Sequence, residues 1–168
     1  MLKAVLRQSV VVASIAVLAA CASTPDEEVA EVTPAPVATQ PSGPIPGSYE
    51  DLQANVGHRV FFGYDQYNLT NEAQAVLRRQ AAWLTEYPET RIRLEGNADE
   101  RGTREYNFAL AARRANAAKA YLVGLGVDAS RIQVISNGKE KPIDPRSTPE
   151  AWAQNRNATT VLLTTVGS

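Results

Sequence analysis

The stretch TRIRLEGNADERGTREYN, residues 90–107, decides the fold of this chain. Its opening alternates charged and apolar side chains, with Ile92 and Leu94 on one face, which predicts a strand over 90–95. A loop rich in charge and glycine follows over 96–103. Helical spacing then begins, so the stretch predicts a strand, a loop and a helix in direct succession.

The helix after this loop is expected over 104–123, where Gly124 and Gly126 end it. Its spacing predicts one side made of Leu110, Ala117, Ala120 and Tyr121. Hydrophobic spacing and stop residues predict the other elements, which are strands at 58–62, 131–136 and 159–165 and helices at 70–87 and 150–156. This order, βαβαβ(α)β, predicts an α+β two-layer sandwich with both long helices on one face of a mixed sheet.

The N-terminal residues 1–20 have the pattern of a signal peptide. Lys3 and Arg7 supply positive charge, and the apolar run after them is shorter than the roughly 20 residues needed to cross a bilayer. The end of this run resembles the bacterial lipobox, which implies that Cys21 is the lipidated N-terminus of the mature protein. Ala22 implies, by the same resemblance, an outer-membrane anchor with the globular domain in the periplasm. A plain signal peptide with an incidental cysteine is the alternative.

Residues 21–48, beginning with that cysteine, are expected to form a disordered tether. They are rich in proline and acidic residues and hold no basic or aromatic side chain, so they cannot bury enough apolar surface to fold. Such a segment reaches roughly 30–85 Å. A globular pattern begins at Tyr49, so we expect one folded domain over 49–168, large enough for a core without disulfides.

Composition narrows the possible functions. The chain has one cysteine and one histidine, which exclude an internal disulfide, most histidine-based triads and Cys/His zinc sites. Its formal net charge is −1, so no partnership with nucleic acid is expected. We expect no cofactor, no metal and no enzymatic activity. A wall-degrading enzyme would need a nucleophile with a base, or paired carboxylates in a cleft.

The stretch from Gly96 to Asn107, continued by Leu110 and Arg113-Arg114-Ala115, strongly resembles the signature of the OmpA-like C-terminal domain. With its lipobox and linker, the chain resembles the peptidoglycan-associated lipoproteins of that family. Other matching segments, in the same order as in the family, are 62–65, 128–132, 138–142 and 153–156. An OmpA-type porin is not expected, because too little chain precedes Tyr49 to build a barrel.

The resemblance implies non-covalent binding of peptidoglycan through the meso-diaminopimelate residue of its stem peptide. It implies that Asp99 pairs with the distal ammonium of that residue and that Arg114 grips its carboxylate, which suits a planar guanidinium. It also implies a pocket completed by Asn107, Asn97, Tyr64 and Asp65. Spacing alone favours a turn residue at Asp99 and a solvated helix residue at Arg114. Replacing either by alanine is expected to abolish wall binding and leave the fold intact.

The resemblance further implies a tether between the outer membrane and the wall, within the Tol system that serves envelope integrity and cell division. Its implied protein partners are the periplasmic β-propeller TolB and other Tol proteins. TolB is implied to compete with the wall for the surface formed by Glu100, Arg101, Thr103 and Arg104. Two residues depart from the family pattern. Asn97 stands where histidine is common, and Asn157 stands where a second arginine often follows Arg156.

Overall fold

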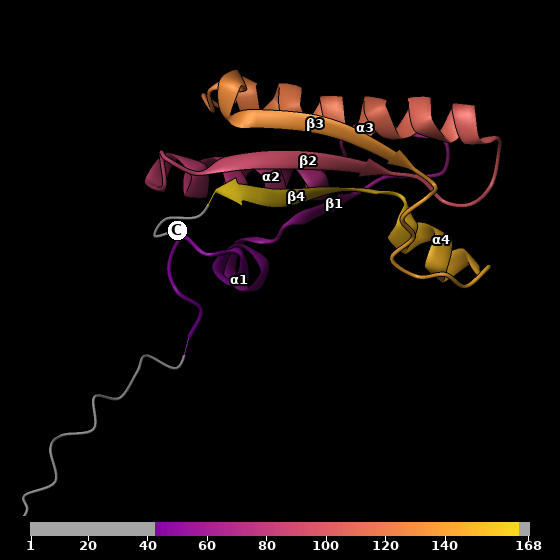
Figure 1. The fold of residues 1–168 in the computed structure, drawn as a ribbon, viewed down its shortest axis with the longest axis horizontal. Coiled ribbons are helices and arrows are strands. Elements are labelled where there is room, and N and C mark those ends of the chain that lie inside the picture. Colours follow the sequence, from indigo (N-terminus) through magenta and orange to yellow (C-terminus); the bar gives the residue numbers. More distant parts are fainter. Residues whose placement is uncertain (1–42, 165–168) are drawn as a thin grey trace, which may run out of the picture. The chain divides into compact units, whose positions relative to one another are not determined.

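Four strands form one mixed sheet in the computed structural model, which describes residues 43–164. They are β1 (Arg59–Phe61), β2 (Arg91–Asn97), β3 (Ile132–Gly138) and β4 (Asn157–Thr164). The order across the sheet is β1-β4-β2-β3, with β2 parallel to β3 and β4 antiparallel to both of its neighbours (Figure 1). The α+β class and the mixed sheet predicted from the sequence are therefore confirmed.

Two long helices cover one face of the sheet. Helix α2 (Asn71–Glu86) begins at Thr70, whose Oγ1 accepts a hydrogen bond from the Ala73 backbone N–H at 3.2 Å. Helix α3 (Arg104–Gly124) begins at Thr103 with the same kind of cap. Each cap stabilises its helix by about 1 kcal/mol. Helix α2 lies behind the strands in Figure 1, and α3 packs along β2 and β3.

Helix α3 turns a different side to the sheet from the one that its spacing predicts. Its buried residues are Asn107, Leu110, Ala111, Arg114, Ala115, Ala118 and Leu122. Of the predicted side, Ala120 is exposed, and Ala117 and Tyr121 are only half-buried. A close approach at Gly96 of β2 sets this rotation, because a Cβ atom there would lie 1.9 Å from the Ala111 carbonyl oxygen. An alanine-rich helix is apolar on most sides, so spacing does not identify the buried one.

The described chain opens with a helical segment that hydrophobic spacing does not predict. Helix α1 (Tyr49–Asp51) runs directly into the π-helical turn η1 (Leu52–Val56). Asp51 accepts a hydrogen bond from Trp83 Nε1 at 2.8 Å, which fastens this segment to α2. The predicted signal peptide, the predicted lipidated cysteine and most of the predicted tether lie outside the described residues. No helix between residues 43 and 164 is long and apolar enough to span a bilayer.

Two short helices complete the described chain. The 3₁₀ turn η2 (Ala129–Arg131) leads into β3, and α4 (Pro149–Asn155) leads into β4. Thr148 Oγ1 caps α4 by accepting from the Ala151 backbone N–H at 3.3 Å, and Pro149 lies in the first turn, where proline is tolerated. The helix predicted near the C-terminus is therefore confirmed.

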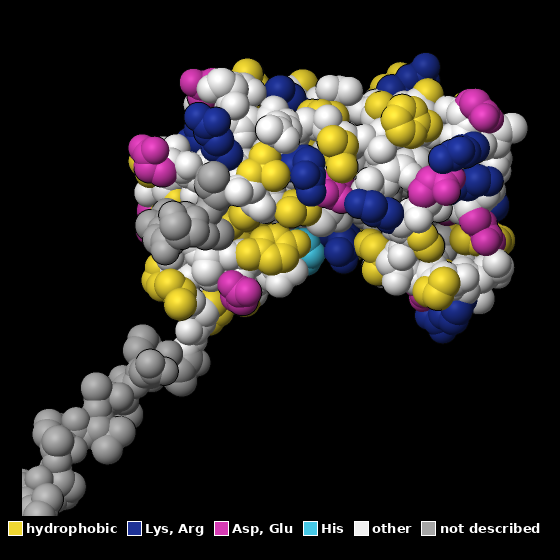
Figure 2. Space-filling view, in the orientation of Figure 1, with side chains coloured by type: hydrophobic (Ala, Val, Ile, Leu, Met, Phe, Trp, Pro, Cys, Tyr) yellow, Lys and Arg dark blue, Asp and Glu magenta, His cyan; other side chains and the backbone are white. Residues whose placement is uncertain are grey.

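The other face of the sheet carries no long helix from residues 43–164 and is turned toward the viewer in Figure 2. Glu95 pairs there with Arg93 at 2.8 Å. Amide side chains join β4, β2 and β3: Asn97 Nδ2 donates to Asn157 Oδ1 at 2.9 Å, and Asn137 Nδ2 donates to Asn97 Oδ1 at 3.0 Å. Both β2 and β3 consequently run past the ends that alternation of apolar residues predicts.

Candidate functional site

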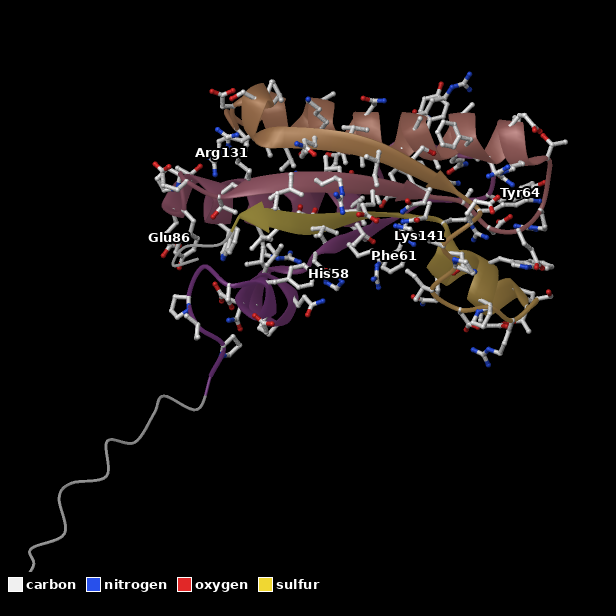
Figure 3. The ribbon with its side chains drawn as sticks, viewed as in Figure 1. His58, Phe61, Tyr64, Glu86, Arg131 and Lys141 are labelled. Atoms are coloured by element: carbon white, nitrogen blue, oxygen red, sulfur yellow. The ribbon has the colours of Figure 1, made fainter. Side chains whose placement is uncertain are left out.

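A pocket of about 180 Å³ opens beside the loop that joins β2 to α3. Its walls come from this loop, from the N-terminal half of α3 and from the turn after β1, to which the labelled Tyr64 of Figure 3 belongs. The lining residues are Tyr64, Asp65, Ala98, Asp99, Arg101, Gly102, Tyr106, Asn107, Leu110 and Arg114. Asp99, on the loop, and Arg114, on α3, thus line one hollow although they are well separated in the sequence.

Arg114 is the largest fully buried side chain among the described residues. Its Nε donates to the Gln66 carbonyl at 2.8 Å, its Nη1 to the Asn97 carbonyl at 2.9 Å and its Nη2 to the Gly63 carbonyl at 3.1 Å. Burial lowers the pKa of Arg114 to about 10, against the opposing effect of the Asp99 carboxylate, so the guanidinium stays charged at neutral pH. The prediction from spacing that Arg114 is a solvated helix residue is wrong, because backbone carbonyls replace water around its charge.

Asp99 lies on the loop with its side chain only 6% exposed. Its Oδ1 accepts from the Arg101 backbone N–H at 3.1 Å and from Arg101 Nε at 3.2 Å, and its Oδ2 accepts from Arg101 Nη2 at 2.7 Å and from Arg156 Nη1 at 3.3 Å. Burial by itself raises the pKa of Asp99, but the hydrogen bonds from Arg101 and Arg156 outweigh it. The pKa therefore lies below its usual value, and Asp99 is ionised at neutral pH.

The lowered pKa of Asp99 makes the stability of the domain depend on pH. Its contribution to the free energy of unfolding is complete above the ordinary aspartate pKa of about 3.9 and is lost as the pH falls toward the lower folded value. We expect the stability difference between wild type and Asp99→Asn to shrink as the pH falls from 5 to 2.5. Urea unfolding across this range measures it, and a difference that stays constant would contradict the assigned protonation state.

The Arg101 side chain covers Asp99 from the solvent side. Its guanidinium carbon lies 4.3 Å from the centre of the Tyr64 ring and 4.2 Å from the centre of the Trp152 ring. Trp152 in turn donates from Nε1 to a carboxylate oxygen of Glu100 at 2.9 Å. Arg101 is less exposed than predicted, because its side chain is 34% exposed and turned onto Asp99, and its part in partner binding stays a prediction.

Three further lining residues hold the loop and the turn in shape. Asn107 is buried on α3 and donates from Nδ2 to the Arg101 carbonyl at 2.9 Å. Gly102 has a φ of +96°, which glycine adopts without the strain that a side chain brings. The Tyr106 hydroxyl donates to the Asp65 carboxylate and so joins α3 to the turn after β1. The pocket is therefore braced by hydrogen bonds between its three walls.

Asn97 does not line the pocket, which corrects the expectation that its side chain completes it. Only its backbone carbonyl contributes, as an acceptor for Arg114. Its side chain bonds instead to Asn157 of the neighbouring strand β4 and to Asn137 of β3. The two departures from the family pattern, Asn97 and Asn157, thus form one hydrogen-bonded pair inside the sheet.

The other residues of the predicted partner surface lie on the solvent side of the loop and the start of α3. Glu100, Thr103 and Arg104 are exposed, and Arg104 Nε lies 3.2 Å from a carboxylate oxygen of Glu140. Among residues 43–164, no three His, Cys, Asp or Glu side chains are grouped so that they could hold a metal ion.

Three side chains in or beside the pocket were not singled out from the sequence as site residues: Tyr106, Trp152 and Arg156. All three lie in or beside segments of the resemblance, but no spacing rule turns them toward the loop. Trp152 belongs to α4 and Arg156 follows it, so only the folding of α4 against the loop brings Trp152 to Glu100 and Arg101 and brings Arg156 to Asp99.

Known proteins resemble the chain over this whole region. The model of the OmpA family matches residues 61–156. This chain belongs to the OmpA family. Among OmpA-family relatives, a peptidoglycan-associated lipoprotein of Rhizobium meliloti is 54% identical over 117 residues, which are 70% of this chain and 66% of that protein. One from Pasteurella multocida is 41% identical over 150 residues, 88% of this chain and 91% of that protein.

The OmpA-family fold is also present in solved structures. The crystal structure of the peptidoglycan-associated lipoprotein from Burkholderia pseudomallei matches with a TM-score of 0.61 and 41% identity, over 62% of this chain and 89% of that one. The chain spans slightly less than two thirds of the Rhizobium meliloti relative. The resemblance to peptidoglycan-associated lipoproteins, first stated from the motifs, is confirmed.

Proposed function

We propose that the chain binds peptidoglycan non-covalently, by the distal end of the diaminopimelate residue of the stem peptide. One observation carries the proposal: Asp99 and Arg114 line a single pocket that opens to solvent. The family supports it, since the relatives are peptidoglycan-associated lipoproteins. The proposed activity is binding rather than catalysis, because the pocket pairs fixed charges that suit a zwitterionic ligand.

The charges of the pocket suit the distal centre of diaminopimelate, which carries one ammonium and one carboxylate. Asp99 accepts hydrogen bonds from the ammonium. Arg114 has five N–H donors, and its three bonds to backbone carbonyls leave two for a carboxylate. Asn107, Tyr64 and Asp65 border the same hollow and complete the proposed binding site.

The distal carboxylate of diaminopimelate is the group by which the site would select between types of stem peptide. A lysine-type stem peptide lacks the distal carboxylate, so it leaves Arg114 without its ligand partner. Charge-assisted hydrogen bonds contribute about 1.5–3 kcal/mol each, and a few of them, less the cost of association, favour micromolar binding. Firm attachment then comes from many membrane-anchored copies that face a polymer with many sites.

Co-sedimentation with purified sacculi tests the proposed function. The full chain is expected to sediment with diaminopimelate-type sacculi and to remain in the supernatant with lysine-type sacculi. Asp99→Asn is expected to remain in the supernatant with both. Asp144→Asn is the matched control, because Asp144 accepts from the side chain and backbone of the residue two positions later, as Asp99 does, but lies outside the pocket. Sedimentation of Asp99→Asn at the wild-type level would reject the pocket.

We also propose that Cys21 carries the lipid that anchors the chain to the outer membrane and leaves the folded domain in the periplasm. Buried acyl chains stabilise membrane attachment by about 0.8 kcal/mol per CH₂, and two or more chains anchor stably. Cys21→Ser is expected to move the protein from the membrane fraction to the soluble fraction after cell lysis. Retention in the membrane fraction would count against lipidation at this residue.

The exposed side of the loop supports a protein partner as well. Glu100, Thr103 and Arg104 are exposed and adjoin the lining residues Asp99, Arg101 and Gly102 in the sequence, so they form a rim of charge and hydroxyl groups beside the pocket. We assign this rim to TolB and to the Tol–Pal envelope system, in which the tether would support envelope integrity and cell division. Because the rim adjoins the pocket, purified TolB is expected to release the chain from sacculi. Binding of both at once would contradict a shared surface.

A further inference from the structure

The carboxylate of Asp99 is already paired within the chain. Arg101 donates to both of its oxygens, from Nη2 to Oδ2 at 2.7 Å and from Nε to Oδ1 at 3.2 Å. Arg156 reaches Oδ2 at 3.3 Å. An ammonium that binds Asp99 therefore arrives at oxygens that hold a guanidinium, and it must displace one of these two cations.

Arg101 is the cation placed to leave. Its side chain is 34% exposed, against 14% for Arg156, and it starts from the loop. Arg156 lies deeper and also donates from Nε to the Phe62 carbonyl at 3.1 Å, so its removal would strand a backbone acceptor. Arg101 gives its side-chain hydrogen bonds to Asp99, and its other close contacts are the faces of two aromatic rings.

The two rings contact the Arg101 guanidinium only weakly. One contact is with the ring of Tyr64, a residue that is 64% exposed, and the other is with the ring of Trp152. A cation–π contact at an exposed site stabilises the position of the cation by only about 0.5–1 kcal/mol. The strong part of the Arg101 contact is its charge-assisted fork on Asp99.

We propose that Arg101 sets the affinity of the proposed wall-peptide site, as an intramolecular cation that the ligand's distal ammonium displaces from Asp99. The inference rests on the proposed function and adds a residue that works against binding. At Asp99 one charged pair replaces another, so the contact of the ammonium with Asp99 yields less free energy than it would with an unpaired carboxylate. A lone amine therefore gains less at this site, and strong retention also needs the carboxylate that Arg114 holds.

Peptide titration of the full chain in detergent tests the proposal. The probes are L-Ala-γ-D-Glu-meso-diaminopimelate and the same tripeptide with 2-aminopimelate, which keeps the distal carboxylate and lacks the distal ammonium. Arg101→Leu keeps an apolar stem between the rings and removes the charge. It is expected to bind the diaminopimelate peptide about tenfold more tightly, the size of one charge-assisted hydrogen bond, and the aminopimelate peptide within about twofold of wild type.

A matched control exists in the same domain. Arg146 forks onto Asp144 from two residues away, as Arg101 does onto Asp99, and it lies outside the pocket. Arg146→Leu removes the same charge and is expected to leave both affinities within about twofold. Unchanged or weaker binding of the diaminopimelate peptide by Arg101→Leu would overturn the proposal.

A second readout needs no substitution at Arg101. Displacement takes the guanidinium away from the Trp152 ring, so the diaminopimelate peptide is expected to change tryptophan fluorescence of the wild-type chain, and the aminopimelate peptide is not. Trp152→Phe should remove the change. An equal fluorescence response to both peptides would contradict displacement by the ammonium.

The proposed function and the role of Arg101 can be rejected independently of each other. If Asp99→Asn binds the diaminopimelate peptide as wild type does, the proposed function itself is wrong. If Asp99→Asn loses binding while Arg101→Leu gains none, the pocket stands and only the role of Arg101 is rejected.

Discussion

Arg114→Ala is expected to lower the free energy of unfolding by about 2–4 kcal/mol, in addition to abolishing peptide binding. The substitution removes the donors that Arg114 supplies to the carbonyls of Gln66 and Asn97, and it leaves the Gly63 carbonyl with only the Gln66 backbone N–H at 3.2 Å. A stranded buried acceptor costs about 1–3 kcal/mol, and the burial penalty of the guanidinium, which disappears, offsets part of the sum. Urea unfolding of the full chain measures the effect. The expectation from sequence that this variant keeps an unaltered fold is therefore replaced.

The neighbouring Arg113 supplies the control for this prediction. It is exposed on α3, where its guanidinium carbon lies 5.7 Å from the centre of the Tyr67 ring. Arg113→Ala is expected to change stability by less than about 0.5 kcal/mol. Equal stabilities of the two alanine variants would show that the three backbone contacts of Arg114 contribute nothing to the fold.

Gly96→Ala is expected to destabilise the domain by about 3 kcal/mol or more, because the added methyl group collides with the backbone of α3. Its Cβ would lie 1.9 Å from the Ala111 carbonyl oxygen and 3.2 Å from the Ala115 Cβ. The backbone of a helix cannot rotate aside as a flexible side chain can, so α3 must move away from β2. Since Asp99 follows β2 and Arg114 lies on α3, this movement also widens the pocket and weakens peptide binding.

Thermal or urea unfolding tests this prediction against Gly124→Ala. Gly124 is the last residue of α3, and a Cβ atom there meets nothing within 4 Å. The alanine is expected to be neutral or slightly stabilising at this position, because glycine is the weaker helix former. A loss at Gly96 no larger than at Gly124 would contradict the close contact between β2 and α3.

The arrangement of strands and long helices followed from the sequence because apolar spacing carries that information. Ile92 and Leu94 alternate with charged residues and both lie in the core. The spacing did not find the true buried side of α3, where Arg114 stands among alanines. It also ended β2 too early, because Asn97 extends the strand through amide pairs to Asn157 and Asn137. Polar pairs between strands leave no hydrophobic pattern.

The meeting of Asp99 and Arg114 came from the family resemblance and not from periodicity. A buried arginine is stable here because carbonyls of distant segments surround it, and no rule of local sequence reports such carbonyls. The inward turn of Arg101 was not predicted either. Its charge-assisted hydrogen bonds go to Asp99, and Trp152, which α4 brings to the loop from far along the chain, adds the weaker ring contact.

The most direct test of the two-charge pocket is a cycle of binding measurements by calorimetry. Wild type and Asp99→Asn are each titrated with the diaminopimelate tripeptide and with its aminopimelate analogue. If the Asp99 carboxylate contacts the distal ammonium, either change alone weakens binding about tenfold or more, and both together weaken it no further. Losses that multiply would mean that Asp99 and the ammonium do not meet.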